Sequence, residues 1–97
     1  MNDRERKILE WLGWDFRDGE YRAPDMDDWF PISMLNPIDL NFLAEYVFPW
    51  FFQWSIHKYG SGHFVCAKSA NGWGYGKNKQ LLEACLQAVE QAINGGE

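Results

Sequence analysis

Residues 70–79 read ANGWGYGKNK, three glycines alternating with two aromatic residues, with two lysines near the end. Such alternation is typical of a β-strand, because successive side chains point to opposite faces of the sheet. Asn71-Gly72 is a strong hairpin signal. We therefore expect Trp73–Gly76 to be a short strand that pairs with the strand before it and carries only glycine on one face.

That turn also predicts a register. Trp73 would lie opposite Ala70, and Tyr75 opposite Lys68, which puts both aromatic rings on one crowded face. The glycines would lie on the other face, which is nearly bare and has room for a helix, a second subunit or a flat ligand. The stretch thus predicts a sheet with two very different faces.

The N-terminal part of the chain is predicted from its caps and turns. Asn2 and Glu5 have capping-box spacing, and Gly13 ends the helix that they begin. Asp18-Gly19 is a preferred two-residue hairpin loop. This loop would pair Asp15 with Arg22, Phe16 with Tyr21, and Arg17 with Glu20. Residues 23–37 hold three prolines and three aspartates and are expected to form a loop.

The second half of the chain predicts a helix, three strands and a helix. Asn36 is the expected cap and Pro37 the first residue of the second helix. Alternation predicts strands at 51–59 and 63–70, and Asn78 is the expected cap of the last helix. The whole order predicts an α+β fold. We expect a three-stranded antiparallel meander packed with two or three helices as a layered sandwich, in a single domain spanning all 97 residues.

Composition disfavours several classes of protein. The chain has 9 basic and 14 acidic side chains and a net charge of −5, which disfavours non-specific nucleic-acid binding. No apolar run approaches the ~20 residues of a membrane span. The charged start MNDRERK leads into no signal-type segment, so a cytoplasmic protein is expected. Cys66 and Cys85 have no partners at metal-ligand spacing and are expected to be reduced core thiols.

A nucleotide-type site is suggested by an incomplete phosphate motif. Gly76-Lys77 lacks the earlier glycine and the following serine or threonine of a phosphate loop. What remains are lysines near a helix start, where free amides favour anions, and aromatic rings on which a base can stack. The candidate ligand-binding residues are Lys68, Trp73, Tyr75, Lys77 and Lys79.

Other candidate sites lack essential residues. Residues 36–94 have the α-β-β-β-α order of a double-stranded RNA-binding domain, but glutamine and glutamate stand where that family carries lysines. The acidic run at 25–28 lacks the glycine of a calcium loop. His57 and His63, expected on one face of adjacent strands, have no third zinc ligand. Since no catalytic constellation is recognisable, we expect no enzyme, no cofactor and no metal.

Aromatic content is the strongest anomaly. Six tryptophans, seven phenylalanines and four tyrosines exceed what so small a core encloses comfortably. Some rings, among Trp14, Trp29, Trp50 and Trp73, are therefore expected on the surface, where aromatic patches mark interfaces. Three carboxylates beside one of them suit a basic partner. The candidate partner-binding residues are Asp25, Asp27, Asp28, Trp29 and Trp50.

The chain resembles the phage ABA-sandwich domain family, small acidic proteins of bacterial viruses. The likeness lies in LEWLGW at Leu9–Trp14, the Asp18-Gly19 hairpin, Trp29-Phe30-Pro31, Asn36-Pro37-Ile38-Asp39 and the closing LLEACLQAVEQAI. It covers nearly the whole chain in spacing and residue character, although Asn78 stands where the family usually has threonine or serine. The resemblance implies an α/β/α layered fold and a viral origin, and it brings no catalytic residues.

Together these features favour a phage-encoded accessory protein that interferes with a host defence system by contact with a host protein. The alternative is a protein that sequesters a small nucleotide near Trp73, Tyr75 and Lys77, and a double-stranded RNA-binding module comes third. Nucleic acid is the less expected ligand because of the net charge. A homo-oligomer through the bare sheet face is compatible with either of the first two.

Overall fold

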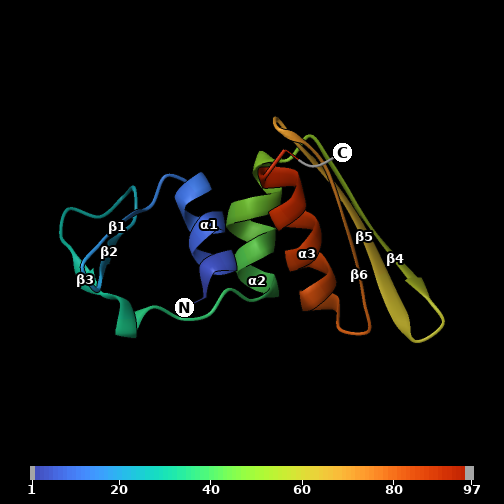
Figure 1. The fold of residues 1–97 in the computed structure, drawn as a ribbon, viewed down its shortest axis with the longest axis horizontal. Coiled ribbons are helices and arrows are strands. Elements are labelled where there is room, and N and C mark those ends of the chain that lie inside the picture. Colours follow the sequence, from blue (N-terminus) through green and yellow to red (C-terminus); the bar gives the residue numbers. More distant parts are fainter. Residues whose placement is uncertain (1, 96–97) are drawn as a thin grey trace. The chain divides into compact units, whose positions relative to one another are not determined.

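The structure is a computed structural model that describes residues 2–95 (Figure 1). It contains three helices and two three-stranded antiparallel sheets, so the expected α+β class is confirmed. The chain divides into two units, with the boundary between Ile38 and Asp39. The layering of a sandwich and the single domain would involve both units, and they stay predictions.

The first unit begins with helix α1 (Asp3–Trp11), whose capping box is confirmed. The Asn2 side chain accepts a hydrogen bond from the Glu5 amide at 2.9 Å, and the Glu5 carboxylate accepts one from the Asn2 amide at 3.3 Å. Gly13 follows the helix with a φ of +96°, which suits glycine at a helix end.

The first sheet is a hairpin extended by a third strand. Strands β1 (Asp15–Arg17) and β2 (Glu20–Arg22) pair in the predicted register, so all three expected cross-strand pairs are confirmed. Strand β3 (Phe30–Pro31) then pairs with β2 and is followed by a short 3-10 turn at Ile32–Met34. The prediction of a loop throughout 23–37 was therefore wrong at β3. A strand of only two residues is too short to show the alternation of side chains by which strands are predicted. Its pairing with β2 is supported by contact between the Tyr21 and Phe30 rings, whose centroids are 6.3 Å apart.

The second helix starts later than predicted. Helix α2 (Leu40–Phe42) is capped by Asp39, whose carboxylate accepts from the Phe42 amide at 2.8 Å, and the Asn36 cap was wrong. The chain before it is held by the Ile38 amide, which donates to the Glu5 carboxylate at 2.9 Å. A π-helical segment (Leu43–Val47) and a 3-10 turn (Phe48–Trp50) continue α2.

The second sheet is a meander of three consecutive strands, β4 (Gln53–Tyr59), β5 (Gly62–Ser69) and β6 (Gly72–Asn78). Trp73 lies opposite Lys68 and Tyr75 opposite Cys66, so the predicted register was wrong and the turn is Ala70-Asn71. The Ser69 hydroxyl explains the shift, because it accepts from the Asn71 amide at 3.0 Å and donates to the Ala92 carbonyl at 2.8 Å. The predicted faces are unchanged, since partners moved by two residues.

Helix α3 (Leu81–Ile93) covers the glycine face of this sheet (Figure 1). A Cβ added to Gly74 would lie 1.9 Å from the Ala88 carbonyl oxygen, and one added to Gly76 would lie 1.8 Å from that of Ala84. The helix backbone therefore rests directly on the strand. The bare face has no room for a ligand or a second subunit, so the expected oligomer through that face was wrong.

The start of α3 also differs from its prediction. Gln80 is the cap residue, whereas Asn78 ends β6 and its side chain accepts from the Gln80 amide at 3.0 Å. The helix is buried along a stripe rich in small residues, which lets its backbone approach the glycines closely. The fully or nearly buried residues of α3 are Ala84, Cys85, Leu86, Ala88, Val89 and Ala92.

Candidate functional site

The face of the β4–β6 sheet that points away from α3 gathers aromatic and basic side chains. Its members follow from the register, because directly opposed residues share a face. Three β5 residues and their β6 partners are the pairs Phe64–Lys77, Cys66–Tyr75 and Lys68–Trp73. We call this surface the open face and define it by those six residues.

Three rings of the open face lie nearly parallel. The Trp73 and Tyr75 centroids are 6.3 Å apart with an interplanar angle of 9°, and those of Phe64 and Tyr75 are 6.2 Å apart at 21°. Tyr75 is 43% exposed, so part of its ring meets solvent. Such a row of rings is a surface on which a flat ligand ring can stack.

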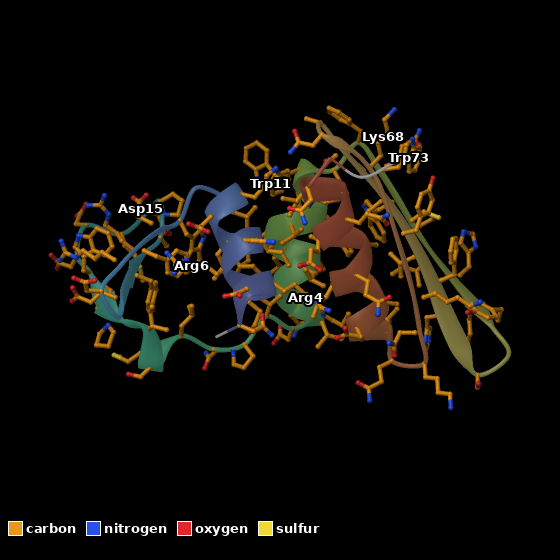
Figure 2. The ribbon with its side chains drawn as sticks, in the orientation of Figure 1. Arg4, Arg6, Trp11, Asp15, Lys68 and Trp73 are labelled. Carbon is orange, nitrogen blue, oxygen red and sulfur yellow. The ribbon has the colours of Figure 1, made fainter. Side chains whose placement is uncertain are left out.

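Lysines flank the rings at both ends. The Lys68 ammonium lies 5.5 Å from the Trp73 ring centroid, and Figure 2 shows these two side chains together at the β5–β6 turn. The Lys77 ammonium lies 5.3 Å from the Tyr59 ring centroid. These cations have no acidic neighbours in sequence, because no Asp or Glu occurs between Glu45 and Glu83.

This charge asymmetry is a signal that the sequence analysis missed. The segment between those two glutamates carries four lysines and no carboxylate, whereas the whole chain has a net charge of −5. The negative net charge of the whole chain therefore does not indicate that this sheet is locally basic. Local potentials, rather than the total, govern the attraction of an anionic ligand.

Two hollows lie along the sheet. The first, about 460 Å³, is lined by Phe51, Phe52, Gln53, Trp54, Ser55, Cys66 and Trp73. The second, about 540 Å³, is lined by Tyr59, Gly60, Ser61, Gly62, Lys77, Asn78 and Lys79. Both volumes fall in the range of small-molecule sites, ~300–1,000 Å³.

Of the five predicted ligand-binding residues, three line one or the other of the two hollows. Trp73 lines the first, with Lys68 beside its ring, and Lys77 and Lys79 line the second. Tyr75 lies between them on β6. Lys77 lies four residues after Trp73 on β6, a distance of about 13 Å along the strand. A small ligand stacked on Trp73 would therefore meet Lys68 before Lys77.

The predicted partner-binding residues are distributed over both units. The side chains of Asp25, Asp27 and Asp28 are exposed in the first unit. Trp29 is half-buried, with the guanidinium groups of Arg17 and Arg22 at 4.0 Å and 4.9 Å from its ring. Its ring is therefore already engaged by cation–π contacts. Trp50 belongs to the second unit and is 70% exposed.

The exposed aromatic residues are mostly ones that the sequence analysis did not single out. Of the four tryptophans considered, Trp50 is exposed and the other three are half-buried. Phe52, directly before β4, is 69% exposed, and Trp54, the second residue of β4, is 50% exposed. The reason is geometric: α3 contacts β6 and β5, and a helix about 10 Å wide covers about two strands spaced ~4.8 Å apart.

The histidines do not form a site. His57 pairs with Phe64, whereas His63 lies on the opposite face of the sheet, so the expected shared face was wrong. His57 Nε2 is 3.2 Å from the Ser55 hydroxyl and His63 Nδ1 is 3.0 Å from the Lys79 carbonyl. Across residues 2–95 no three metal-ligating side chains come together.

Both cysteines are free thiols. Cys85 lies on the buried side of α3, and this burial raises its pKa from 9.0 to about 11. Cys66 is half-buried and lines the first hollow.

Comparisons with protein-family models, curated proteins and solved structures found no match. The likeness to the phage family therefore rests on the sequence features quoted above. In the described part of the chain, no helix has the length and apolar character to cross a membrane.

Proposed function

We propose that this chain is a non-enzymatic binding protein that holds a nucleotide-type ligand on its open face. One observation supports this above others: near-parallel rings and lysines share one face of a sheet whose strands carry no carboxylate. Rings stack on bases and ammonium groups attract phosphates. A nucleotide requires both a ring for its base and a cation for its phosphate.

The first hollow suits the base. Trp73 forms part of its lining, and Gln53 and Ser55 supply polar groups that can hydrogen-bond to base edges. Lys68 stands over the Trp73 ring, where it can pair with a phosphate. The second hollow, with Lys77 and Lys79, would take the phosphate of a longer ligand.

Binding is tested by titrating the protein with nucleoside mono- and diphosphates while its tryptophan fluorescence is recorded at low salt. Short single-stranded oligonucleotides and an RNA duplex form separate arms. Removing the ring that lines the first hollow, in Trp73→Ala, should weaken binding about 5- to 150-fold, the effect of ~1–3 kcal/mol of stacking. Lys68→Gln should weaken it and reduce its salt dependence.

The matched control is Lys7→Gln, which removes the same charge from α1 and should leave affinity unchanged. Tighter binding of the oligonucleotide than of the mononucleotide would show that both hollows are used. Absence of binding in every arm at low salt would refute the proposal, and so would equal losses in the Lys68 and Lys7 variants.

We propose contact with a host protein as a second candidate function, supported by the exposed rings of Trp50 and Phe52. Large exposed aromatic side chains are frequent anchors of protein interfaces. The resemblance to phage proteins supports a phage-encoded accessory role against a host defence system. A bacterial lysate should yield a partner that binds the native chain and is lost with Trp50→Ser. Recovery of the same proteins by the native chain and this variant would contradict the idea.

A further inference from the structure

The two edges of the β4–β6 sheet differ. On the β6 edge, the Tyr75 amide donates to the Gln91 side chain at 2.7 Å and the Lys77 amide donates to the Gln87 side chain at 3.0 Å. Both glutamines belong to α3. They occupy donors that an added strand would need, so this edge is closed to strand addition.

The β4 edge has no such closure. The Tyr75 amide points away from β5, so its partner Cys66 directs its own backbone groups toward β4 and bonds to Ser55. The N–H and C=O groups of successive residues in a strand point alternately to its two edges. Three β4 residues therefore point their N–H and C=O groups outward: Trp54, Ile56 and Lys58. Within residues 2–95 no hydrogen bond ends on these groups.

The side chains on this edge are apolar as well. Trp54 is 50% exposed and Ile56 is 40% exposed, on the face where α3 covers only the other two strands. The Phe48 ring covers one side of Trp54, with centroids 4.7 Å apart. The result is an unpaired edge of seven residues with exposed apolar side chains, which natural proteins rarely leave without a partner.

We propose that β4 pairs antiparallel with β4 of a second copy of this chain, about a two-fold axis at Ile56. The outward groups of Trp54 would then bond to those of Lys58 of the second copy, and Ile56 to its own counterpart. Each of these pairs exchanges two backbone hydrogen bonds. The two sheets would join as one sheet of six strands.

The sequence of β4 is complementary to itself in this register. The Lys58 ammonium would lie beside the Trp54 indole of the second copy, a favourable cation–π arrangement. The two Ile56 side chains would meet at the axis, and no like charges would oppose each other. Because the β6 edge is closed, each copy offers this sheet one free edge, and the pairing ends at two copies. This inference does not depend on nucleotide binding.

The test is the mass of the full chain in solution, measured by light scattering or sedimentation over a range of concentrations. The native chain should be dimeric. Ile56→Lys places two like charges opposite each other at the axis and should weaken the dimer at least tenfold, with the circular dichroism of the monomer unchanged. Trp50→Lys is the matched control, because it adds the same charge at a more exposed ring outside β4.

A second measurement does not rely on that variant. Ile56→Cys should give a covalent dimer on oxidation, because hydrogen-bonded antiparallel partners have Cα atoms ~5.5 Å apart, within disulfide reach. Trp50→Cys should not. A native chain that is monomeric at millimolar concentration would overturn the inference. So would equal weakening by the Ile56 and Trp50 lysine variants, which would indicate general apolar association.

Discussion

Replacing Gly74 with alanine tests how α3 is seated on the sheet. The added Cβ would lie 1.9 Å from the Ala88 carbonyl oxygen and 2.4 Å from the Ala92 amide nitrogen. Ordinary contact needs about 3.4 Å, so the helix must retreat by roughly 1.5 Å or the strand must bend. The φ of Gly74 is not positive, so alanine adds no backbone strain of its own. The effect is therefore steric.

The expected cost is large for so small a protein. Overpacking of a core costs ~1–3 kcal/mol when side chains can rearrange, but the obstructing atoms here are helix backbone. We expect a loss of at least about 3 kcal/mol from the free energy of unfolding, against a total of ~5–15 kcal/mol. The melting temperature should fall by about 12 °C or more. A second substitution, Ala88→Gly, should not rescue the variant because the carbonyl remains.

Urea unfolding followed by tryptophan fluorescence gives the free energy directly. Gly62→Ala is the matched control: this strand glycine also has no positive φ, and its added Cβ would meet its nearest neighbours at 3.6 Å. That control should be neutral or slightly stabilising. If Gly74→Ala unfolds within ~0.5 kcal/mol of the native chain, the close seating of α3 on the glycine face is refuted.

Three further predictions concern single groups. Since burial raises the pKa of Cys85 from 9.0 to about 11, the folded state holds its proton longer than the unfolded state. The contribution of this thiol to the free energy of unfolding is complete below about pH 9 and is lost as the pH rises to about 11, at ~1.4 kcal/mol per pH unit. In Cys85→Ala, the free energy of unfolding measured at equilibrium should lack this dependence on pH. Gln91→Leu removes the acceptor of the Tyr75 amide and should cost ~0.5–1.5 kcal/mol, with faster hydrogen exchange at Tyr75; unchanged exchange would contradict the closed edge. Asp39→Ala should cost ~1 kcal/mol by chemical denaturation, whereas a comparable loss in Asn36→Ala would contradict the observed cap.

Local features were predictable from the sequence where the interacting residues are close along the chain. The Asn2–Glu5 capping box and the hairpin around Asp18-Gly19 were found in the structure as predicted. Both depend on hydrogen bonds and pairings over a few residues, and caps and tight turns specify these directly. The same reasoning identified which face of β6 carries glycine, since side-chain alternation survives a shift of the turn.

Errors arose where a distant group competed with a local signal. The Asn71-Gly72 turn moved by one residue because Ser69 hydrogen-bonds to the Ala92 carbonyl, 23 residues away. The helix expected at Asn36 begins after Asp39, because the preceding amide of Ile38 is bound by Glu5 on another helix. Caps and turns are worth about 1 kcal/mol each, so one tertiary hydrogen bond is enough to shift them.

The sequence by itself determined the α+β class, the glycine face and the aromatic face of the second sheet. Only the tertiary structure decided that α3 fills the glycine face, that its glutamines close the β6 edge, and that α3 does not extend over β4. The physical reason is that periodicity fixes which side chains share a face. The placement of α3 over two of the three strands depends on contacts between Gly74, Gly76 and the α3 backbone. These residues are distant in the sequence, so no local sequence pattern predicts the contacts.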